Sequence, residues 1–163
     1  MNVKLRNMTA IYIMKDDMIL MLYRVGSKVV RDSWCGIVGH FENDELNDPQ
    51  KAMLRELKEE ANIDISSLEN LKMRYVTLRL KNGEVRQNYY FFANLKENTS
   101  IDLNSNEGTL KWIPISEVLN LEMPFTAKEV LKHYIETAMN DDILHAGTTM
   151  EHDVLFHPLK EFD

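Results

Sequence analysis

The segment Asp48–Ile63 constrains the fold of this chain most, because it carries the boundary signals of one helix. Asp48 followed by Pro49 is typical of an N-cap and a first helical residue. The Asp carboxylate can accept a hydrogen bond from an unpaired helical N–H, and proline has no N–H to lose. Asn62 stands where helices often end in the left-handed conformation, which asparagine tolerates better than any residue except glycine. These signals predict a helix that begins at Asp48–Pro49 and ends near Asn62.

The predicted helix has an apolar face and an acidic face. The apolar residues recur at helical spacing, with three glutamates on an arc roughly opposite to them. The apolar face contains Met53, Leu54, Leu57 and Ala61, and the acidic face contains Glu56, Glu59 and Glu60. Neighbouring glutamates repel each other, and only Arg55 is placed to neutralise or orient one of them. Oxygen ligands favour a hard cation, Mg²⁺ or Mn²⁺, although an acidic stripe that faces solvent is the alternative.

The residues before the helix extend this pattern into a longer motif. Together they form Gly39-x5-Glu45, then Arg55-Glu56-Leu57-x-Glu59-Glu60-x-x-Ile63. This motif resembles the Nudix box of MutT-like pyrophosphohydrolases, Gly-x5-Glu-x7-Arg-Glu-U-x-Glu-Glu-x-Gly-U, in which U is aliphatic. Two departures occur: nine residues separate Glu45 from Arg55, interpreted as two extra residues near Leu46–Asn47, and Asn62 replaces the late glycine. Neither departure removes a carboxylate, and a pattern over this many positions is a strong signal.

The resemblance implies a fold and a reaction. We expect an α/β protein with a mixed sheet sandwiched between helices, as one domain over residues 1–163 with the box at 39–63 and a C-terminal extension from about 140 to 163. The implied reaction is Mg²⁺-dependent hydrolysis of a nucleoside diphosphate linked to another group, which needs no covalent protein nucleophile. Such a site also has candidate ligands and a candidate base. The candidate metal ligands are Glu56, Glu60, Glu59 and a backbone carbonyl near Gly39, and the candidate catalytic residues are Glu59, Arg55 and Glu107. Glu59 and Glu107 are alternatives for the general base.

The substrate is less constrained. The chain looks most like the MutT-type branch, which implies a nucleoside triphosphate such as an oxidised purine, for example 8-oxo-dGTP. Some such enzymes carry a Trp-Pro-Asp-Asp segment, but Met123–Thr126 stands at the matching place here. Arg24, Arg86 and Phe125 are candidate substrate-binding residues, with an exposed strand position as the alternative for Arg86 and core packing as the alternative for Phe125. The same choice applies to Trp34, where core packing is favoured over base stacking.

The rest of the chain predicts further strands and helices. Thr9–Met14 and Met18–Arg24 indicate a hairpin, followed by a loop over residues 25–32 and a strand Trp34–Val38. Asn82–Gly83 predicts a second hairpin between residues 73–80 and 85–95, whose arginines, Arg74 included, are expected to be exposed. We then expect a surface loop over 96–106, a strand at 110–113, a helix over 126–139 and a C-terminal hairpin that pairs 143–146 with 154–156.

Composition limits the partners. A net charge of −7 argues against general nucleic-acid binding, and the lone Cys35 suits a reducing compartment. The chain has no apolar run of membrane-spanning length, so we expect a cytoplasmic protein with no membrane partner and a small nucleotide as substrate. The C-terminal extension is a candidate for homodimer formation or closure over the substrate. A Nudix-fold domain that senses a nucleotide without cleaving it is the alternative function.

Overall fold

The computed structural model describes residues 2–26 and 31–163, so residues 27–30 of the predicted loop lie outside the described residues. Within the described part, the strands are β1 (Lys4–Lys15), β2 (Met18–Arg24), β3 (Ser33–Cys35), β4 (Ile37–His40), β5 (Leu68–Lys81), β6 (Glu84–Leu95), β7 (Asn104–Ser105), β8 (Gly108–Pro114), β9 (His145–Thr149) and β10 (Val154–Pro158). The helices are α1 (Pro49–Ala61), α2 (Ile115–Val118) and α3 (Phe125–His133).

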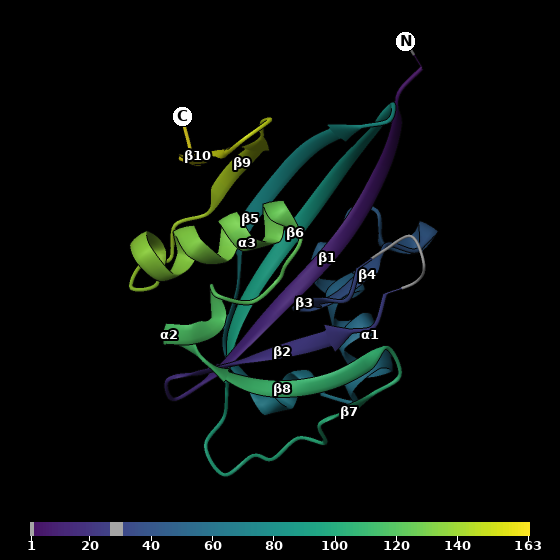
Figure 1. Cartoon of the computed structure of the whole chain (residues 1–163). Coiled ribbons are helices and arrows are strands. Elements are labelled where there is room, and N and C mark those ends of the chain that lie inside the picture. The colour runs from purple at the N-terminus through teal and green to yellow at the C-terminus, as the bar shows by residue number, and fades with distance from the viewer. Residues whose placement is uncertain (1, 27–30) are drawn as a thin grey trace.

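The strands form one mixed sheet in the order β10-β9-β5-β6-β1-β2-β8-β7, with β3 paired to β2 and β4 paired to β1 (Figure 1). β1 runs parallel to β6 and antiparallel to β2 and β4. β5 is antiparallel to β6 and parallel to β9. β1 therefore lies near the middle of the sheet, next to the strand that carries Gly39.

The alternation along β1 shows why the sheet is covered on both faces. Ile11 and Ile13 belong to one buried cluster, whereas Ala10 and Tyr12 belong to a second. Successive strand residues point to opposite faces, so each face of β1 supplies a separate core. The α1 residues Met53, Leu57 and Ala61 pack into the first cluster, as their helical spacing predicts; Val130 and Leu131 of α3 pack into the second. The predicted sandwich of a mixed sheet between helices is confirmed.

Both predicted long hairpins are present, and their turns use residues that accept positive φ. Asp16 has φ of 54° between β1 and β2, and Asn82 and Gly83 have φ of 54° and 71° between β5 and β6. Such conformations are costly for most side chains, which is why Asn, Asp and Gly mark these turns. The strands extend beyond the predicted limits, because β1 begins at Lys4 and β5 at Leu68.

Three predicted elements differ from the structure. The strand expected over Trp34–Val38 is divided at Gly36, where a Cβ atom would lie 2.7 Å from the carbonyl oxygen of Ile11. The loop expected over 96–106 contains the short strand β7. The helix expected over 126–139 ends at His133 and continues as a π-helical turn, Tyr134–Ala138.

A C-terminal hairpin is present as predicted and extends the sheet, but its first strand covers His145–Thr149 and not 143–146, so residues 147–149 of the predicted turn belong to the strand. β9 and β10 pair with Thr149 opposite Val154, and His145 lies opposite Tyr75 of β5. The expectation that Arg74 is exposed was wrong, since its residue is only 3% exposed. Its guanidinium donates to the carbonyl oxygens of Ile143 and Ala138 and to the Asp141 carboxylate, at 3.0, 2.8 and 2.7 Å. Arg74 thus joins β5 to the segment that follows α3.

Cys35 is a buried free thiol. None of the described helices has the length and hydropathy that a membrane-spanning helix requires.

Candidate active site

The limits of α1 are those expected from its capping residues. The Asp48 carboxylate accepts a hydrogen bond from the Lys51 N–H at 3.0 Å, and Pro49 is the first helical residue. Asn62 ends the helix in the left-handed conformation, with φ of 52° and ψ of 37°. Leu46 and Asn47, the residues interpreted as an insertion, lie in the turn before this helix. The insertion therefore leaves the helix and its face of glutamates continuous.

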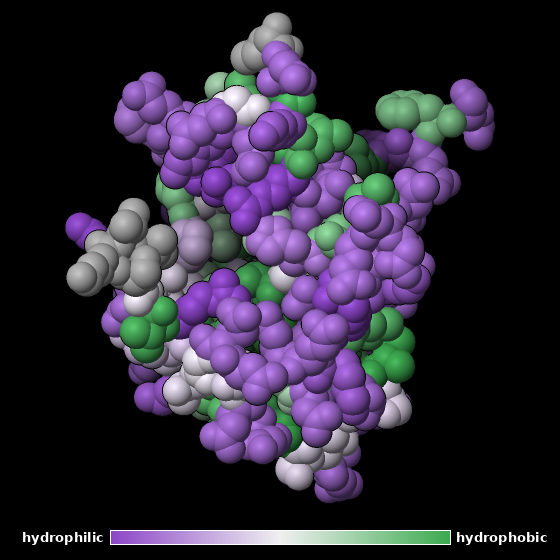
Figure 2. Space-filling view, turned by 90° about the vertical axis from the view of Figure 1, so that its right-hand side faces the viewer, coloured by the Kyte–Doolittle hydropathy of each residue, from purple (hydrophilic) through white to green (hydrophobic). Residues whose placement is uncertain are grey.

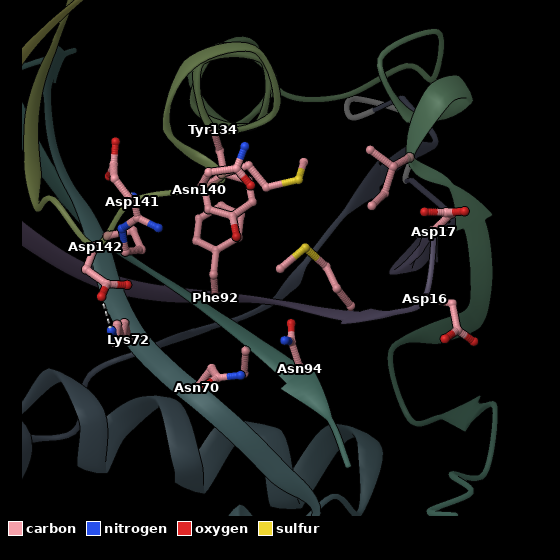
Figure 3. A pocket seen from close by; sticks show the side chains of 15 residues that line it. Asp16, Asp17, Asn70, Lys72, Phe92, Asn94, Tyr134, Asn140, Asp141 and Asp142 are labelled. Atoms are coloured by element: carbon pink, nitrogen blue, oxygen red, sulfur yellow. Dashed lines mark hydrogen bonds and ion pairs between the residues drawn. The ribbon is translucent and has the colours of Figure 1, made fainter. Parts of the chain in front are cut away.

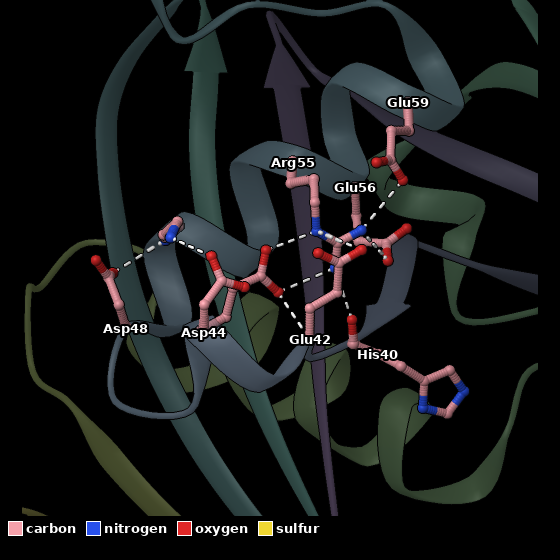
Figure 4. Close-up of polar contacts among 9 residues, drawn as sticks. His40, Glu42, Asp44, Asp48, Arg55, Glu56 and Glu59 are labelled. Atoms are coloured by element: carbon pink, nitrogen blue, oxygen red, sulfur yellow. Dashed lines mark hydrogen bonds and ion pairs between the residues drawn. The ribbon is translucent and has the colours of Figure 1, made fainter.

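Arg55 connects the helix to the loop before it (Figure 4). Its Nε and Nη2 atoms donate to the two carboxylate oxygens of Glu45 at 2.6 and 3.0 Å, and Nη2 also donates to the carbonyl oxygen of His40 at 2.8 Å. Its Nη1 atom donates to Glu56 at 2.8 Å and to Glu59 at 3.1 Å. These bonds fix the direction of three carboxylates and raise the pKa of Arg55, with Glu45 the largest cause.

Glu45 is a buried carboxylate whose oxygens are both bonded. Besides Arg55, the N–H of Glu42 donates to Glu45 Oε2 at 2.9 Å and closes a capping box at the short 3₁₀ turn Asn43–Glu45. Hydrogen bonds to the ionised form lower the pKa of Glu45, those from Arg55 most of all. The sequence alone gave no indication of this role, because the partner is ten positions away on another element.

Gly39 of β4 lies directly against Glu56 of α1. A Cβ atom at position 39 would lie 2.0 Å from Glu56 Cδ, so any side chain there would have to displace the glutamate. The glycine thus allows the acidic face of the helix to approach the strand backbone. This approach brings the predicted Gly39 carbonyl region and the Glu56 carboxylate into one site.

Glu60 is the buried acid that lacks a full set of partners. Its residue is 9% exposed, and its Oε2 atom has no hydrogen-bond partner among the described residues. Burial raises the pKa of Glu60 to about 7, the charges of Glu107 and Glu56 act in the same direction, and Arg24 opposes them. A buried, underbonded carboxylate beside two others fits a divalent cation, because hard cations take several oxygen ligands.

Glu107 reaches this site from the turn between β7 and β8. Its N–H donates to Ser105 Oγ at 3.2 Å, and Asn106 Nδ2 donates to the carbonyl oxygen of Glu59 at 3.0 Å. Gly108 packs so closely on β2 that a Cβ atom would lie 2.1 Å from the carbonyl oxygen of Tyr23. The turn is thus attached to both α1 and β2. Asn106 was missed by sequence reasoning, since a polar turn residue carries no mark of its distant partner.

The candidate substrate-binding residues lie in three different settings. Arg24, at the end of β2, pairs with Glu107, with 2.9 Å between Nη2 and Oε2. Arg86 lies on β6 and pairs with Glu84 at 3.0 Å, so its observed partner is a strand neighbour. Phe125 is the first residue of α3 and is 37% exposed. The contacts bring Arg24 to the carboxylates and leave Arg86 paired on its own strand.

Aromatic rings lie near the start of β3. Trp34 is half-buried, and its ring lies 5.0 Å from that of Tyr23 between centroids. The backbone N–H of Trp34 donates to the carbonyl oxygen of Glu122 at 2.8 Å, three residues before Phe125. Trp34 also packs against the core cluster on the α3 side of the sheet, as the favoured interpretation expected.

A second acidic group lies beside the first. Glu42, Asp44 and Glu45 offer carboxylate oxygens within 4.8 Å of one another. Lys51 already pairs with Asp44 at 2.8 Å, and Arg55 pairs with Glu45. These two side chains offset part of the charge of the three carboxylates, so the group fits a metal ion less well than the Glu60 site. The surrounding face of the molecule is largely hydrophilic (Figure 2).

A separate cavity of about 470 Å³ lies where α3 and its π-helical extension approach the ends of β5 and β6 (Figure 3). Its lining includes Phe92 and Tyr134 and two ion pairs, Lys72 with Asp142 at 2.6 Å and Arg74 with Asp141 at 2.7 Å. The described residues that line it include none of the glutamates of α1. The ion pairs hold the C-terminal segment to the sheet, and we assign the cavity no part in the site.

Comparisons with known proteins agree with this geometry. The family model described as NUDIX domain matches residues 4–134. Similar solved structures include a mutator MutT protein from Bacillus halodurans, with a TM-score of 0.66 and 19% identity over 94% of this chain and 97% of that chain. A NUDIX hydrolase from Nitrosomonas europaea has a TM-score of 0.69 and 17% identity over 90% and 79%. A C. elegans Ap4A hydrolase in a binary complex has a TM-score of 0.60 and 20% identity over 82% and 96%. No curated protein sequence matches the chain.

Proposed function

The chain belongs to the Nudix pyrophosphohydrolase family, and from this premise we propose that it is a Mg²⁺-dependent hydrolase of a nucleoside diphosphate linked to another group. The products would be a nucleoside monophosphate and the phosphorylated remainder. The observation that carries the proposal is the buried Glu60 carboxylate, whose Oε2 atom has no partner among the described residues while two further carboxylates adjoin it. A buried charge of this kind is costly unless a cation completes it.

We assign the metal ligands to the acidic face of α1. Glu56 and Glu60 would hold Mg²⁺ or Mn²⁺, with Glu59 and the Gly39 carbonyl as further candidates. Arg55 already fixes one oxygen of Glu56 at 2.8 Å, which leaves its other oxygen to face the ion. When bound, the cation supplies charge neutralisation for the diphosphate and lowers the pKa of a coordinated water. Arg55 is then a positioning residue that holds the ligands in a fixed direction.

The general base is proposed among two carboxylates, Glu59 and Glu107. Glu59 is held by Arg55 at 3.1 Å, and its side chain is 58% exposed. The charge of Glu107 acts on Glu60 and helps to raise its pKa. A base is worth about 10²- to 10⁴-fold in rate. A variant that lowers kcat at saturating metal identifies the base, and one that lowers metal affinity identifies a ligand.

We propose a nucleoside triphosphate as the substrate, with an oxidised purine such as 8-oxo-dGTP as the first to test. Tyr23 and Trp34 supply aromatic surface near the end of the strand that carries Arg24, and Phe125 is a partly exposed aromatic residue at the start of α3. The proposal also places the enzyme in a reducing cytoplasm, where the buried Cys35 stays a thiol. The alternative is a domain that binds a nucleotide without hydrolysing it.

Hydrolysis measured with Mg²⁺ tests the proposal. The panel contains canonical and oxidised nucleoside triphosphates, dinucleoside polyphosphates and nucleotide sugars, with products separated by chromatography. Wild type should release a nucleoside monophosphate from at least one substrate, and Glu60→Gln should not. Binding of a nucleotide without turnover by wild type would favour the sensing domain.

A further inference from the structure

Arg24 is engaged by a carboxylate of the candidate metal site. Its Nη2 atom lies 2.9 Å from Glu107 Oε2, and the two side chains are 35% and 47% exposed. The Nε atom of Arg24 is buried and has no hydrogen-bond partner among the described residues. The guanidinium is therefore held mainly by Glu107, although Arg24 was expected to be a substrate-binding residue.

Glu107 has a fixed backbone and a side chain with two neighbours. The bonds from Asn106 to α1 and the packing of Gly108 on β2 hold the turn in place. From this position the carboxylate pairs with Arg24 and is near enough to Glu60 for its charge to act on that group. Because the turn is attached to both α1 and β2, we expect a change of partner to come from rotation of the Glu107 side chain and not from movement of the turn.

A cation bound at Glu60 would draw the Glu107 side chain away from Arg24. It would attract the Glu107 carboxylate and repel the Arg24 guanidinium. Once the ion pair opens, Arg24 has free donors at the edge of the site, and a guanidinium binds phosphate oxygens through two parallel hydrogen bonds.

We propose that Glu107 exchanges between Arg24 and the bound cation, so that cation binding releases Arg24 to the phosphate of the substrate. This inference rests on the proposed function and deepens it. Arg24 is a positioning residue for Glu107 before the cation binds, and a substrate-binding residue afterwards. Since Glu107 then serves as a ligand, Glu59 is left as the base.

The test is a double-mutant cycle on Mn²⁺ affinity, measured by electron paramagnetic resonance on metal-free protein without substrate. Glu107→Gln should weaken Mn²⁺ binding at least tenfold. Even the loss of a group that only hydrogen-bonds to a metal ligand lowers metal affinity about 10- to 100-fold. Arg24→Gln should strengthen Mn²⁺ binding about twofold to fivefold, which corresponds to the strength of an exposed ion pair. In the Glu107→Gln background, Arg24→Gln should have a clearly smaller effect, because only the direct repulsion between the cation and the guanidinium remains to be removed.

A matched charge variant and a check of folding make the outcomes decisive. Lys58→Gln also removes one exposed positive charge, from a pair with Asp64 at 3.0 Å, and should leave Mn²⁺ affinity nearly unchanged. An equal gain from Arg24→Gln in both backgrounds would mean a general charge effect and would overturn the exchange. Unchanged affinity in Glu107→Gln would overturn it as well. Thermal melting of each metal-free variant checks that the fold is retained.

A second measurement covers the phosphate step. Binding of imidodiphosphate at saturating Mg²⁺ should weaken about tenfold in Arg24→Gln and recover in part in Arg24→Lys. Unchanged binding would overturn the release of Arg24 to phosphate. If wild type and Glu60→Gln both bind no Mn²⁺, the proposed function itself fails. If wild type binds Mn²⁺ but the double-mutant cycle shows no coupling between Arg24 and Glu107, only the exchange fails.

Discussion

Glu45 and Glu60 are two buried glutamates of the same motif in opposite surroundings. Glu45 is 1% exposed, and both of its oxygens accept hydrogen bonds, from Arg55 and from the N–H of Glu42. Glu60 is 9% exposed, and one of its oxygens has no partner among the described residues. The pKa of Glu45 is lowered and the pKa of Glu60 is raised to about 7.

The difference separates a carboxylate that holds the loop to the helix from one that we propose as a metal ligand. Arg55 neutralises Glu45 and thereby attaches the loop before α1 to the helix. The same guanidinium reaches Glu56 and Glu59 but does not contact Glu60. Burial alone therefore does not make Glu60 the better candidate ligand; its unfilled hydrogen-bond position beside other carboxylates does.

The largest expected effect comes from removing the Arg55 guanidinium, which donates to both oxygens of Glu45. Arg55→Met should lower the free energy of unfolding by about 3–5 kcal/mol, because it leaves a buried carboxylate without its partner. Urea denaturation measures this change. Lys51→Met, which breaks only the exposed pair with Asp44, should cause a much smaller loss. Equal losses in the two variants would show that Glu45 does not depend on Arg55 for its hydrogen bonds and charge balance.

Neutralising the two glutamates should have opposite effects on the metal-free protein. Glu45→Gln should lower the free energy of unfolding by about 1.5–3 kcal/mol, since it weakens hydrogen bonds to a charged group. Glu60→Gln should raise it at pH 7.5, because it removes a buried charge that neighbouring carboxylates repel. Both variants are measured by urea denaturation in EDTA. A stabilised Glu45→Gln or a destabilised Glu60→Gln would reverse the assignment of the two roles.

The raised pKa of Glu60 should make the free energy of unfolding depend on pH. Its native pKa of about 7 lies above the ordinary value of 4.5, so between these values the native state binds more protons than the unfolded state. The free energy of unfolding in EDTA should therefore fall as pH rises from about 4.5 to 7, relative to Glu60→Gln at each pH. Glu45 acts in the opposite sense, since its lowered pKa gives stability above about pH 4.5 that is lost on acidification. Parallel profiles for wild type and Glu60→Gln would contradict the raised pKa.

The smallest expected effect concerns the turn that presents Glu107. Asn106→Ala should remove the bond to the Glu59 carbonyl, which is worth about 0.5–1.5 kcal/mol, and should weaken Mn²⁺ binding a few-fold. Asn140→Ala, at the cavity beside the C-terminal segment, is the matched control and should leave Mn²⁺ affinity unchanged. If both variants bind Mn²⁺ like wild type, the attachment of the turn to α1 has no part in the site.

Local signals in the sequence predicted the parts of the fold that depend on neighbouring residues. The ends of α1 followed from the capping chemistry of Asp48 and Asn62, and the β5–β6 hairpin followed from Asn82–Gly83. The break at Gly36 was not predictable in this way, because it depends on the Ile11 carbonyl of another strand. Arg74 was placed wrongly for the same reason, since its partners lie 64 to 69 positions later.

The candidate site shows the same division. The spacing of Glu56, Glu59 and Glu60 predicted one shared helix face, which depends only on helical geometry. It did not reveal that Arg55 saturates Glu45 or that Asn106 attaches the β7–β8 turn to Glu59, because both contacts form only when distant elements pack. The roles of the individual glutamates in binding and catalysis stay predictions.

The most direct test is a crystal structure of the protein grown with Mn²⁺, with the ion located by its anomalous scattering. We expect an ion within coordination distance of Glu56 and Glu60 oxygens, with Glu107 turned toward it and away from Arg24. An ion bound instead by Glu42 and Asp44, with Glu60 still uncoordinated, would contradict the proposed metal site.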